Sequence, residues 1–562
     1  MTKGNGHTKI IIGMGTCGLS AGAKDIYEEA SLFVKKKGLN ADIIPTGCIG
    51  MCHKEIMLDI EVPQRTRVSY GEVRRDDVSE ILKTHIIKKQ VMKEKVVGQM
   101  RSDDSDISPY PRIPFFEDLP YNNRQKRIVL SNCGYIDPRS IDDYMDRDGY
   151  IAIRRVLSSF TPEKVIEVIK RSGLRGRGGA GFPTWKKWEF CRNADGDTKY
   201  LICNADEGDP GAFMDRSVLE GDPHSLIEGM IIAAFAIGAS RGYIYVRAEY
   251  PLAIERLETA LFYTEERGLL GNNILGKGFD FDIELRHGAG AFVCGEETAL
   301  IASIDGERGM PKPKPPFPAI SGLWNRPTNI NNVETLANIP RIISNGSDWY
   351  GAFGTDKSKG TKTFALTGDI NNPGLIEVPM GISLKEIIYD IGGGIAGNRA
   401  LKAVQTGGPS GGCIPAELID TPIDYESLST IGTIMGSGGM VVLDDTTCMV
   451  DMARYFLKFD MEESCGKCTP CRIGTKRMVE ILERISNRKG REGDIDLLID
   501  IGKDIKDTSL CGLGQTAPTP VLTTIKYFRE EYEQHIKEKR CPTRGCLGKN
   551  KEKDKYLAKP KS

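Results

Sequence analysis

Residues 173–188 read GLRGRGGAGFPTWKKW, and this stretch decides the fold class of the chain. Residues 176–181 match the pattern G-x-G-x-x-G, which in a Rossmann fold follows a strand and opens a helix. Here the preceding residues 161–172 begin with Thr161 and Pro162 and repeat apolar residues at helical spacing, so they predict a capped helix. The glycine loop therefore follows a helix, and this order argues against a Rossmann fold.

The same loop suits an anionic ligand for another reason. Backbone amides without side chains can approach a phosphate closely, and the guanidinium groups of Arg175 and Arg177 can hold it. A flexible, solvated loop explains these residues equally well when they are taken alone. Three further polar clusters favour a ligand site, namely NADEGDPG at 204–211, CGEET at 294–298 and NNVET at 331–335.

Length, charge and hydropathy restrict the class of protein. A chain of 562 residues is long enough for several domains. Its 76 basic and 77 acidic residues nearly cancel, so no overall charge favours a nucleic-acid partner. The longest apolar stretch, 226–239, is interrupted by Glu228 and is too short to span a bilayer, and the N-terminus lacks a secretion signal. We therefore expect a cytoplasmic protein without a membrane span.

Cysteine spacing predicts an iron–sulfur cluster. Fifteen cysteines without a secretion signal favour metal ligation over disulfides, because cytosolic thiols stay reduced. Cys465, Cys468 and Cys471 form a C-x2-C-x2-C loop, and Cys511 follows after a long helical stretch. Such a loop points three thiolates at one cubane cluster while the distant cysteine completes the cage. A structural zinc site usually divides its cysteines into two pairs, so we predict a [4Fe–4S] cluster here.

Periodicity and composition divide the chain into six segments. Helical spacing, short β-rich runs and turn residues distinguish them. They are residues 1–90, a small α/β module; 91–149, a charged linker that would wrap over a neighbouring surface; 150–350, an α/β domain; 360–425, a small α+β domain; 450–536, a helical bundle; and 537–562, a basic tail with cysteines. The predicted fold class is therefore α/β with several domains.

Together these motifs resemble a known family. GLRGRGGAGFPTWKKW, NADEGDPGAF, GAGAFVCGEETAL, PKPPFPA, NNVETLANIP and ESCGKCTPC with SLCGLG are similar to the NADH-binding flavoprotein subunit of respiratory complex I. They are more similar still to the beta subunit of NAD-linked, often electron-bifurcating, [FeFe]-hydrogenases and related formate dehydrogenases. The resemblance covers residues 118–535. It implies a thioredoxin-like N-terminal domain, a non-Rossmann FMN-binding domain, a β-grasp (SLBB-like) domain and a helical bundle that holds the [4Fe–4S] cluster.

The resemblance also implies which residues contact the ligands. For FMN these are Gly176, Arg177, Gly178, Lys187, Asn204, Asp206, Glu207, Gly295, Glu296, Asn331, Asn332, Thr335, Gly512 and Leu513. For NADH they are Phe182, Phe190, Asp209, Glu297, Lys314 and Phe317. Glu207 and Glu297 would position the nicotinamide for hydride transfer, and no side chain would act as an acid or base. Many complex I members have tyrosine and glutamate in place of Phe292 and Asp209, whereas hydrogenase-type members resemble this chain more closely there.

A second cysteine group lies near the N-terminus. Cys17, Cys48 and Cys52 resemble the ligands of a thioredoxin-like [2Fe–2S] ferredoxin, but that cluster normally takes four cysteines. Neither Gly22 nor Glu29 replaces the missing one simply. The module therefore either binds a [2Fe–2S] cluster or keeps its fold for docking.

A third group lies near the C-terminus. His535, Cys541 and Cys546 follow the last predicted helix, and Cys448 becomes a fourth ligand if the chain folds back. Neutral imidazole with three thiolates makes a closed zinc site, and ordinary reduced cysteines are the alternative. The remaining cysteines are predicted to be core or pocket thiols, namely Cys133, Cys191, Cys203, Cys294 and Cys413.

The predicted function is electron input into a soluble complex. The resemblance implies hydride transfer between NAD(H) and FMN and single-electron relay through the [4Fe–4S] cluster to partner subunits. The expected partners are an iron–sulfur alpha subunit of hydrogenase or formate dehydrogenase type and a small [2Fe–2S] gamma subunit. The complex is expected to be a hydrogenase, which could bifurcate electrons; a formate dehydrogenase or another reductase stays open. A non-catalytic scaffold or nicotinamide sensor is the other alternative, but it would have no need of cluster ligands.

Overall fold

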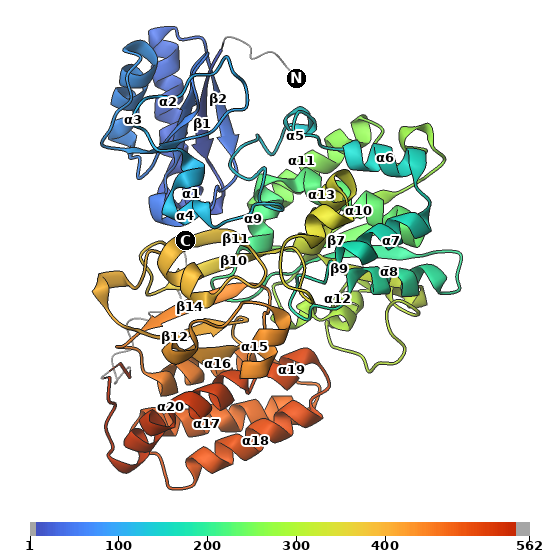
Figure 1. The fold of residues 1–562 in the computed structure, drawn as a ribbon. Helices are drawn as coiled ribbons and strands as arrows, with labels where there is room; N and C mark the ends of the chain where they lie inside the picture. The colour runs from blue at the N-terminus through green and yellow to red at the C-terminus, as the bar shows by residue number, and fades with distance from the viewer. Residues whose placement is uncertain (1–6, 544, 547–562) are drawn as a thin grey trace.

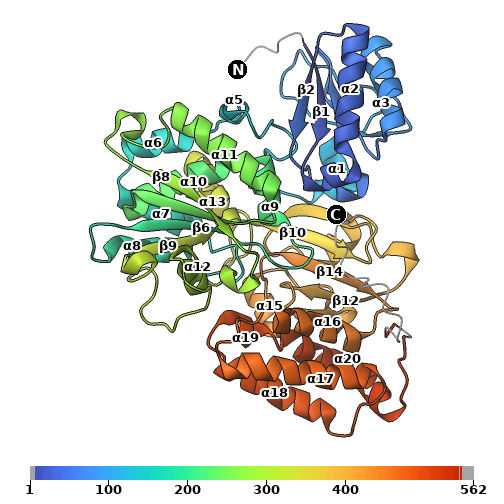
Figure 2. The ribbon, with the colours of Figure 1, turned by 180° about the vertical axis from the view of Figure 1, so that it is seen from behind.

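The structure, a computed structural model, describes residues 7–543 and 545–546 (Figure 1). Within these residues the strands form sheets of five, four and five members, in the orders β2-β1-β3-β4-β5, β8-β7-β6-β9 and β11-β10-β14-β12-β13. The N-terminal module lies at one end and the helical domain at the other, with the third sheet between them (Figures 1 and 2). The domain that contains the four-stranded sheet lies beside this third sheet.

The N-terminal module is a sheet covered by helices. Its elements are β1 (Thr8–Gly13), α1 (Thr16–Ala21), α2 (Ala23–Lys37), β2 (Ala41–Thr46), β3 (Leu58–Glu61), β4 (Val68–Tyr70), α3 (Arg75–Leu82) and β5 (Val96–Gln99). β1 pairs parallel with β2 and antiparallel with β3, and the strand–helix–strand order agrees with the sequence prediction. β5 lies beyond residue 90, so the sheet takes its last strand from residues expected to form the linker.

A buried carboxylate holds the segment that leads into the central domain. This segment contains α4 (Pro120–Asn123) and α5 (Ile141–Met145). Between these helices the backbone N–H groups of Ile128, Val129 and Leu130 donate to the carboxylate of Glu377, at 2.8, 3.1 and 2.9 Å. The hydroxyl of Thr361 donates to the same carboxylate at 2.5 Å. The segment is therefore fixed to the third sheet, which includes Glu377, by hydrogen bonds shielded from water.

The central domain is built on a parallel sheet. Its elements are α6 (Ile151–Ser159), α7 (Pro162–Ser172), α8 (Thr184–Asn193), β6 (Tyr200–Ala205), α9 (Met214–Gly221), α10 (Pro223–Ile237), β7 (Arg241–Arg247), α11 (Pro251–Glu266), β8 (Asp282–Gly288), α12 (Glu297–Ile304), β9 (Thr328–Asn332), α13 (Val333–Asn345) and α14 (Ser347–Gly351). The strands β6 to β9 pair in parallel. α7 precedes the glycine loop and is capped by the Thr161 hydroxyl, which confirms the helix-first order.

The long apolar stretch of the sequence forms the buried helix α10. Its Glu228 carboxylate accepts the Tyr144 hydroxyl at 2.7 Å and the N–H groups of Tyr150 and Ile153 at 2.9 and 3.1 Å. These three donors replace water around a carboxylate in the core. Among the described residues no helix is both long enough and apolar enough to cross a membrane.

The third sheet is mixed and sits next to the central domain. Its domain contains β10 (Thr361–Gly368), β11 (Gly374–Pro379), the short π-helix η7 (Glu386–Ile391), β12 (Leu401–Thr406), β13 (Gly412–Pro415), α15 (Tyr425–Ile431) and β14 (Gly439–Asp444). β14 pairs parallel with β10 and antiparallel with β12, so the middle strand of the sheet comes last in the chain and lies beyond residue 425.

The helical domain follows directly. It contains α16 (Met449–Glu462), α17 (Thr475–Ser486), α18 (Asp494–Thr508), α19 (Gly512–Thr516) and α20 (Thr519–Lys537). Leu457, Leu482, Leu498 and Val521 come from four of these helices and are fully buried in one core. The apolar residues that recur at helical spacing in the sequence thus face one another.

A buried ion pair joins the central domain to the mixed sheet. Nζ of Lys362 on β10 lies 2.5 Å from Oε2 of Glu334 on α13, and the two side chains are 0% and 2% exposed. Lys362 also donates to the carbonyls of Thr363 and Ser437 at 2.9 and 2.5 Å. Glu334 accepts the N–H and hydroxyl of Thr363 at 2.9 and 2.7 Å. Both charges are therefore compensated and hydrogen-bonded.

Lys362→Met should lower the free energy of unfolding by about 3–5 kcal/mol, because Glu334 would stay buried without a counter-ion. Urea unfolding followed by circular dichroism measures this change. Lys385→Met is the control, since its pair with Asp420 spans 3.6 Å and is largely exposed; it should change stability by less than about 1 kcal/mol. Lys362→Met combined with Glu334→Leu should recover most of the loss. A double variant as unstable as Lys362→Met would contradict the ion-pair interpretation.

Candidate functional site

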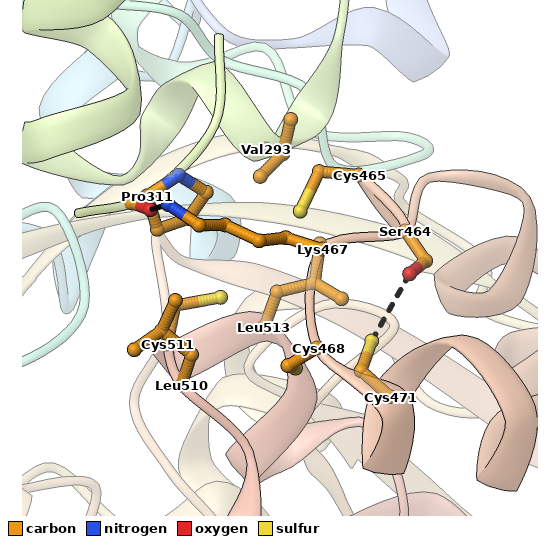
Figure 3. Close-up of a pocket in the computed structure, with 10 residues that line it drawn as sticks. All are labelled: Val293, Pro311, Ser464, Cys465, Lys467, Cys468, Cys471, Leu510, Cys511 and Leu513. Carbon is orange, nitrogen blue, oxygen red and sulfur yellow. Dashed lines mark hydrogen bonds between the residues drawn. The ribbon is translucent and has the colours of Figure 1, made fainter. Parts of the chain in front are cut away.

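Four cysteines surround one pocket of the helical domain (Figure 3). Cys465 and Cys468 come from the loop after α16, Cys471 comes from the short π-helix η10 (Pro470–Gly474), and Cys511 is the residue before α19. The complete lining is Val293, Pro311, Ser464, Cys465, Lys467, Cys468, Cys471, Leu510, Cys511 and Leu513. The fold thus brings the distant cysteine to the three-cysteine loop, in the arrangement that the spacing predicted.

Local hydrogen bonds shape the cysteine loop. Gly466 has φ of 76°, a conformation that favours glycine and lets the chain turn between the first two cysteines. The Gly466 N–H donates to the Ser464 hydroxyl at 3.3 Å, and that hydroxyl lies 3.2 Å from the Cys471 sulfur. Burial raises the pKa of Cys471 to about 11 and also raises the pKa of Cys511. Backbone N–H groups of Gly514 and Leu513 oppose the rise at Cys511.

The cysteine pocket abuts the central domain. Nζ of Lys467 donates to the carbonyl of Pro311 at 2.7 Å, and the carboxylate of Glu463 accepts the N–H of Phe292 at 2.9 Å. Cys465 and Leu513 pack against the central-domain core that includes Val293. Since Pro311 and Val293 belong to the central domain, the pocket is formed by two domains.

The glycine loop connects α7 to α8 and is closed by backbone bonds. The Gly176 N–H donates to the Phe182 carbonyl at 2.8 Å. Gly178 is exposed on the loop and lies close to Asn332: a Cβ added at Gly178 would be 3.1 Å from the Asn332 Cβ. Any larger residue at 178 would press on the Asn332 side chain. The loop therefore presents bare backbone next to the end of β9.

The guanidinium of Arg177 is fully buried and donates its hydrogen bonds to groups of the protein. It donates to the carbonyls of Thr361, Arg175 and Lys359 at 2.9, 2.9 and 2.6 Å and to the hydroxyl of Tyr350 at 2.9 Å. The side chain of Arg175 likewise binds carbonyls and Glu426. A phosphate contact of these two residues stays a prediction; in the structure both guanidinium groups donate to protein groups. Their role is to fix the loop.

The polar residues at the end of β9 and the start of α13 also bind groups of the protein. The side-chain oxygen Oδ1 of Asn331 accepts the Trp188 indole N–H at 2.8 Å. Asn332 accepts the N–H of Glu334 at 2.9 Å and donates to Asp215 at 2.5 Å. The Thr335 hydroxyl accepts the Arg177 N–H at 2.8 Å. These bonds fix Asn331, Asn332 and Thr335, which form the floor beneath the glycine loop.

Asp206 is buried without a partner. Neither of its carboxylate oxygens has a hydrogen-bond partner among the described residues, and burial raises the pKa of Asp206 to about 7. The Asn204 amide spans the site, because it donates to the Gly295 carbonyl at 2.9 Å and accepts the Asp206 N–H at 3.1 Å. A Cβ at Gly295 would lie 4.0 Å from Asp206 Oδ2. The missing side chain leaves space beside an acceptor that lacks donors, which suits a hydroxylated ligand.

Glu207 and Asp209 contact protein groups. The Glu207 carboxylate accepts the N–H groups of Asp215 and Arg216 at the start of α9, each at 3.1 Å, and burial raises its pKa. Asp209 accepts the Ser437 hydroxyl, and burial raises the pKa of Asp209 to about 6. Glu207 therefore caps α9, whereas Asp209 connects the central domain to the loop before β14.

Two lysines meet two carboxylates at the start of α12. Nζ of Lys314 lies 2.6 Å from Glu297 and 3.0 Å from Glu296, and Nζ of Lys187 lies 3.3 Å from Glu297. Lys187 also donates to the Ile330 carbonyl at 2.9 Å. Burial opposes ionisation of Glu297, but the charges of Lys187 and Lys314 keep its pKa below the usual range. Glu296 in addition caps α12 through the N–H groups of its first turn.

Three phenylalanines predicted to contact NADH expose their rings. Phe182, Phe190 and Phe317 are 44%, 48% and 54% exposed. Phe182 and Phe190 come from the glycine loop and α8, and Phe317 follows Lys314 in the chain. Exposed aromatic rings near charged groups are suited to bind a flat heterocycle.

The N-terminal cysteines lie together. Cys52 contacts the thiols of Cys17 and Cys48; these contacts lower the pKa of Cys17 and raise the pKa of Cys52. The guanidinium of Arg216 on α9 lies 3.8 Å from the Cys17 sulfur. The structure therefore places the three-thiol site against the central domain.

The C-terminal group also assembles. The ligand atoms of Cys448, His535, Cys541 and Cys546 all lie within 4.8 Å of one another. His535 Nδ1 lies 2.7 Å from the Glu531 carbonyl, which leaves Nε2 facing Cys546 at 3.0 Å and Cys448 at 3.6 Å. A backbone carbonyl that orients a histidine in this way is typical of metal sites. Residues 544 and 547–562 of the predicted tail lie outside the described residues.

Several site residues had no sequence signal. Asp215, Arg216 and Ser437 meet the predicted residues only through the packing of α9 and of the loop before β14. The remaining cysteines are buried, as predicted for core or pocket thiols: Cys133, Cys191, Cys203, Cys294 and Cys413.

Comparison with protein-family models matches three parts of the chain. Residues 169–341 match the Nuo51 FMN-binding domain, residues 363–414 match the SLBB domain, and residues 451–535 match the NADH-ubiquinone oxidoreductase-F iron-sulfur binding region. The middle match corresponds to the mixed sheet, and the last corresponds to the helical domain with the four-cysteine pocket.

Individual relatives agree with these matches. The HndC subunit of the NADP-reducing hydrogenase of Solidesulfovibrio fructosivorans is 61% identical over 423 residues, which are 75% of this chain and 86% of that protein. A subunit of the NADH-quinone oxidoreductase of Rhizobium meliloti is 47% identical over 415 residues, 74% of this chain and 99% of that protein. An NAD+-reducing [NiFe]-hydrogenase in the H2-reduced state has a similar structure, with a TM-score of 0.66 at 29% identity over 94% of this chain and 84% of that chain.

The chain belongs to the family of NADH-binding FMN/iron–sulfur subunits that occur in complex I and in NAD-linked hydrogenases. It is an oxidoreductase subunit with an FMN-binding domain, an SLBB domain and a [4Fe–4S] region, as the resemblance implied.

Proposed function

We propose that this chain is the electron-input subunit of a cytoplasmic hydrogenase complex, carrying reducing equivalents between NAD(H) and iron–sulfur partner subunits. One observation carries the proposal: the four-cysteine pocket is built partly by Val293 and Pro311 of the FMN-binding domain. Glu296 and Glu297 follow Val293 closely in the chain, and Lys314 follows Pro311. The cluster pocket and the carboxylate–lysine site therefore share the same short segments.

The residues around Asp206 fit the flavin. Bare backbone at Gly178 would face the phosphate, and the unpaired Asp206 carboxylate beside Gly295 would accept hydroxyl groups of the ribityl chain. The ammonium of Lys187 would add positive charge at the same site. FMN bound there would accept a hydride from the nicotinamide and release its electrons singly.

The residues around Glu297 fit the nicotinamide dinucleotide. The rings of Phe182, Phe190 and Phe317 would cover the adenine, and Lys314 would bind a phosphate. Glu297 would then hydrogen-bond a hydroxyl or the carboxamide. These contacts hold the two reacting rings together, so the chain contributes geometry rather than an acid or base.

Relatives support a hydrogenase partner. The 61% identity is to a subunit of a hydrogenase, whereas the 47% identity is to a subunit of a quinone oxidoreductase. We therefore propose an iron–sulfur hydrogenase alpha subunit and a small [2Fe–2S] gamma subunit as partners, with electron bifurcation depending on their clusters. A formate dehydrogenase partner is the alternative. Because the first relative is named for NADP, both nicotinamides belong in the functional test.

If electrons pass from the flavin to the [4Fe–4S] cluster, loss of a cluster ligand should stop reduction of the cluster without stopping reduction of the flavin. In anaerobic titration of the reconstituted chain with NADH and with NADPH, flavin absorbance and low-temperature paramagnetic signals are followed together. Cys468→Ser should leave flavin bleaching nearly unchanged. It should lower the signal of the reduced cubane at least about tenfold, because losing even a residue that only supports a metal ligand costs roughly 10- to 100-fold. Cys413→Ser, at a buried cysteine of β13, is the control. Full cubane reduction in Cys468→Ser, or no flavin binding by the parent chain, would contradict the relay.

Glu297→Gln should weaken NADH binding by roughly tenfold, because a neutral amide orders Lys187 and Lys314 less well. FMN content should stay unchanged. Glu307→Gln removes an exposed carboxylate from a similar pair with Lys312 and is the matched control. Equal loss of FMN and NADH binding would contradict this assignment and would indicate that Glu297 contacts the flavin.

We also propose a structural zinc ion bound by Cys448, His535, Cys541 and Cys546. One imidazole and three thiolates form a closed tetrahedral site, and the compact arrangement of the four ligand atoms supports it.

Cys541→Ser combined with Cys546→Ser should remove about one zinc ion per chain in elemental analysis, because two neutral hydroxyls replace two thiolates. The [4Fe–4S] signal should persist. Cys468→Ser provides the reverse control, since it should keep the zinc. Unchanged zinc in the double variant would exclude the site.

A further inference from the structure

The carboxylate of Glu55 lies beside the three thiols of the N-terminal module. Its Oε1 is 3.8 Å from the Cys48 sulfur. Its Oε2 is buried and has no hydrogen-bond partner among the described residues. A buried carboxylate oxygen without a donor is costly, so this oxygen is a candidate to contact a bound group.

The backbone of β1 leaves space in front of this carboxylate. A Cβ added at Gly13 would lie 3.9 Å from Glu55 Oε2, and its other nearest atoms would be the carbonyl oxygen and Cβ of Met57 at 3.7 and 3.8 Å. These are ordinary contact distances, so a side chain fits at residue 13 and would touch the carboxylate. Glu55 therefore occupies the place that a ligand from β1 could also reach.

We propose that Glu55 is the fourth ligand of a [2Fe–2S] cluster, with the thiolates of Cys17, Cys48 and Cys52 as the other three. Binding releases the thiol protons and any carboxyl proton and forms three Fe–S bonds and one Fe–O bond. Terminal ligands other than cysteine are compatible with such clusters, as the histidines of Rieske centres show. Glu55 thus replaces the cysteine that the sequence lacks.

The arrangement of the thiols, in which Cys52 contacts both Cys17 and Cys48, favours a two-iron cluster over a single ion. The ligand atoms of the Cys448 group lie within 4.8 Å of one another; among the described residues, Cys17, Cys48 and Cys52 do not form such a compact group. One zinc ion requires the compact arrangement, whereas the ligands of two irons are distributed over both metals.

One cationic and one anionic side chain of the central domain border the three thiols. Arg216 places its guanidinium 3.8 Å from the Cys17 sulfur, and the N–H of Thr16 donates to Glu220 at 2.8 Å. Both partners belong to α9 of the FMN-binding domain. The positive charge of Arg216 offsets part of the negative charge of the ligands, although Arg216 also pairs with the Glu220 carboxylate at 3.7 Å. The inference concerns ligation alone and does not depend on the proposed hydride transfer.

The test is Glu55→Gln in the full chain, purified without oxygen and examined by iron analysis and paramagnetic resonance. The variant should lose about two irons per chain and the [2Fe–2S] signal, while FMN and the cubane signal remain and show that the chain is folded. Glu72→Gln is the control, because Glu72 is an exposed carboxylate paired with Lys54. It should keep all the iron.

Gly13→Cys combined with Glu55→Gln should restore the iron, because a thiol at residue 13 fits the same space. Its signal should have altered g values, since a thiolate replaces an oxygen ligand. Full iron content with an unchanged signal in Glu55→Gln would overturn the proposal. A parent chain whose iron accounts for the cubane alone, or one with zinc or a disulfide at the three thiols, would also overturn it.

Discussion

The buried ion pair between Lys362 and Glu334 fixes the FMN-binding domain to the mixed sheet, and the site depends on that junction. Glu334 stands two residues after Asn332 and one before Thr335, so the same helix start carries both the ion pair and the floor of the glycine loop. Arg177 crosses the same junction, because its guanidinium binds the carbonyl of Thr361 on β10. The SLBB domain thus supports the loop from outside, although none of its residues was predicted to contact the flavin.

Several charged side chains around this site are buried. Arg177, Lys362, Glu334 and Glu377 are all fully or almost fully enclosed, and each is surrounded by backbone or hydroxyl groups rather than by water. Such groups contribute little net stability but tolerate few alternative arrangements. Asp206 differs from them because its oxygens have no donor among the described residues. This contrast distinguishes charged groups that hold the domains together from the one that we propose contacts the flavin.

Sequence reasoning predicted the features that depend on local order. The helix before the glycine loop, the buried helix α10 and the helical C-terminal domain follow from caps and periodicity. The gathering of Cys511 with the three-cysteine loop follows from ligand chemistry. The burial of the Arg177 guanidinium could not be predicted, because its partners come from distant residues of the mixed-sheet domain. The position of Glu55 could not be predicted for the same reason, because its proximity to Cys48 and to the space at Gly13 arises from the fold and not from the spacing of residues in the sequence.

The loop that contains Cys48 and Cys52 is wedged between two domains. The carbonyl of Gly50 accepts the N–H of Leu375 at 2.8 Å, and a Cβ at Gly47 would lie 2.4 Å from the Cα of Gly221. The loop is thus held by backbone contacts on both sides, although Cys17 and Cys52 themselves stay partly exposed. Any shift of the N-terminal module against either neighbour would therefore displace two of the three thiols, so the geometry of this site depends on how the domains are assembled.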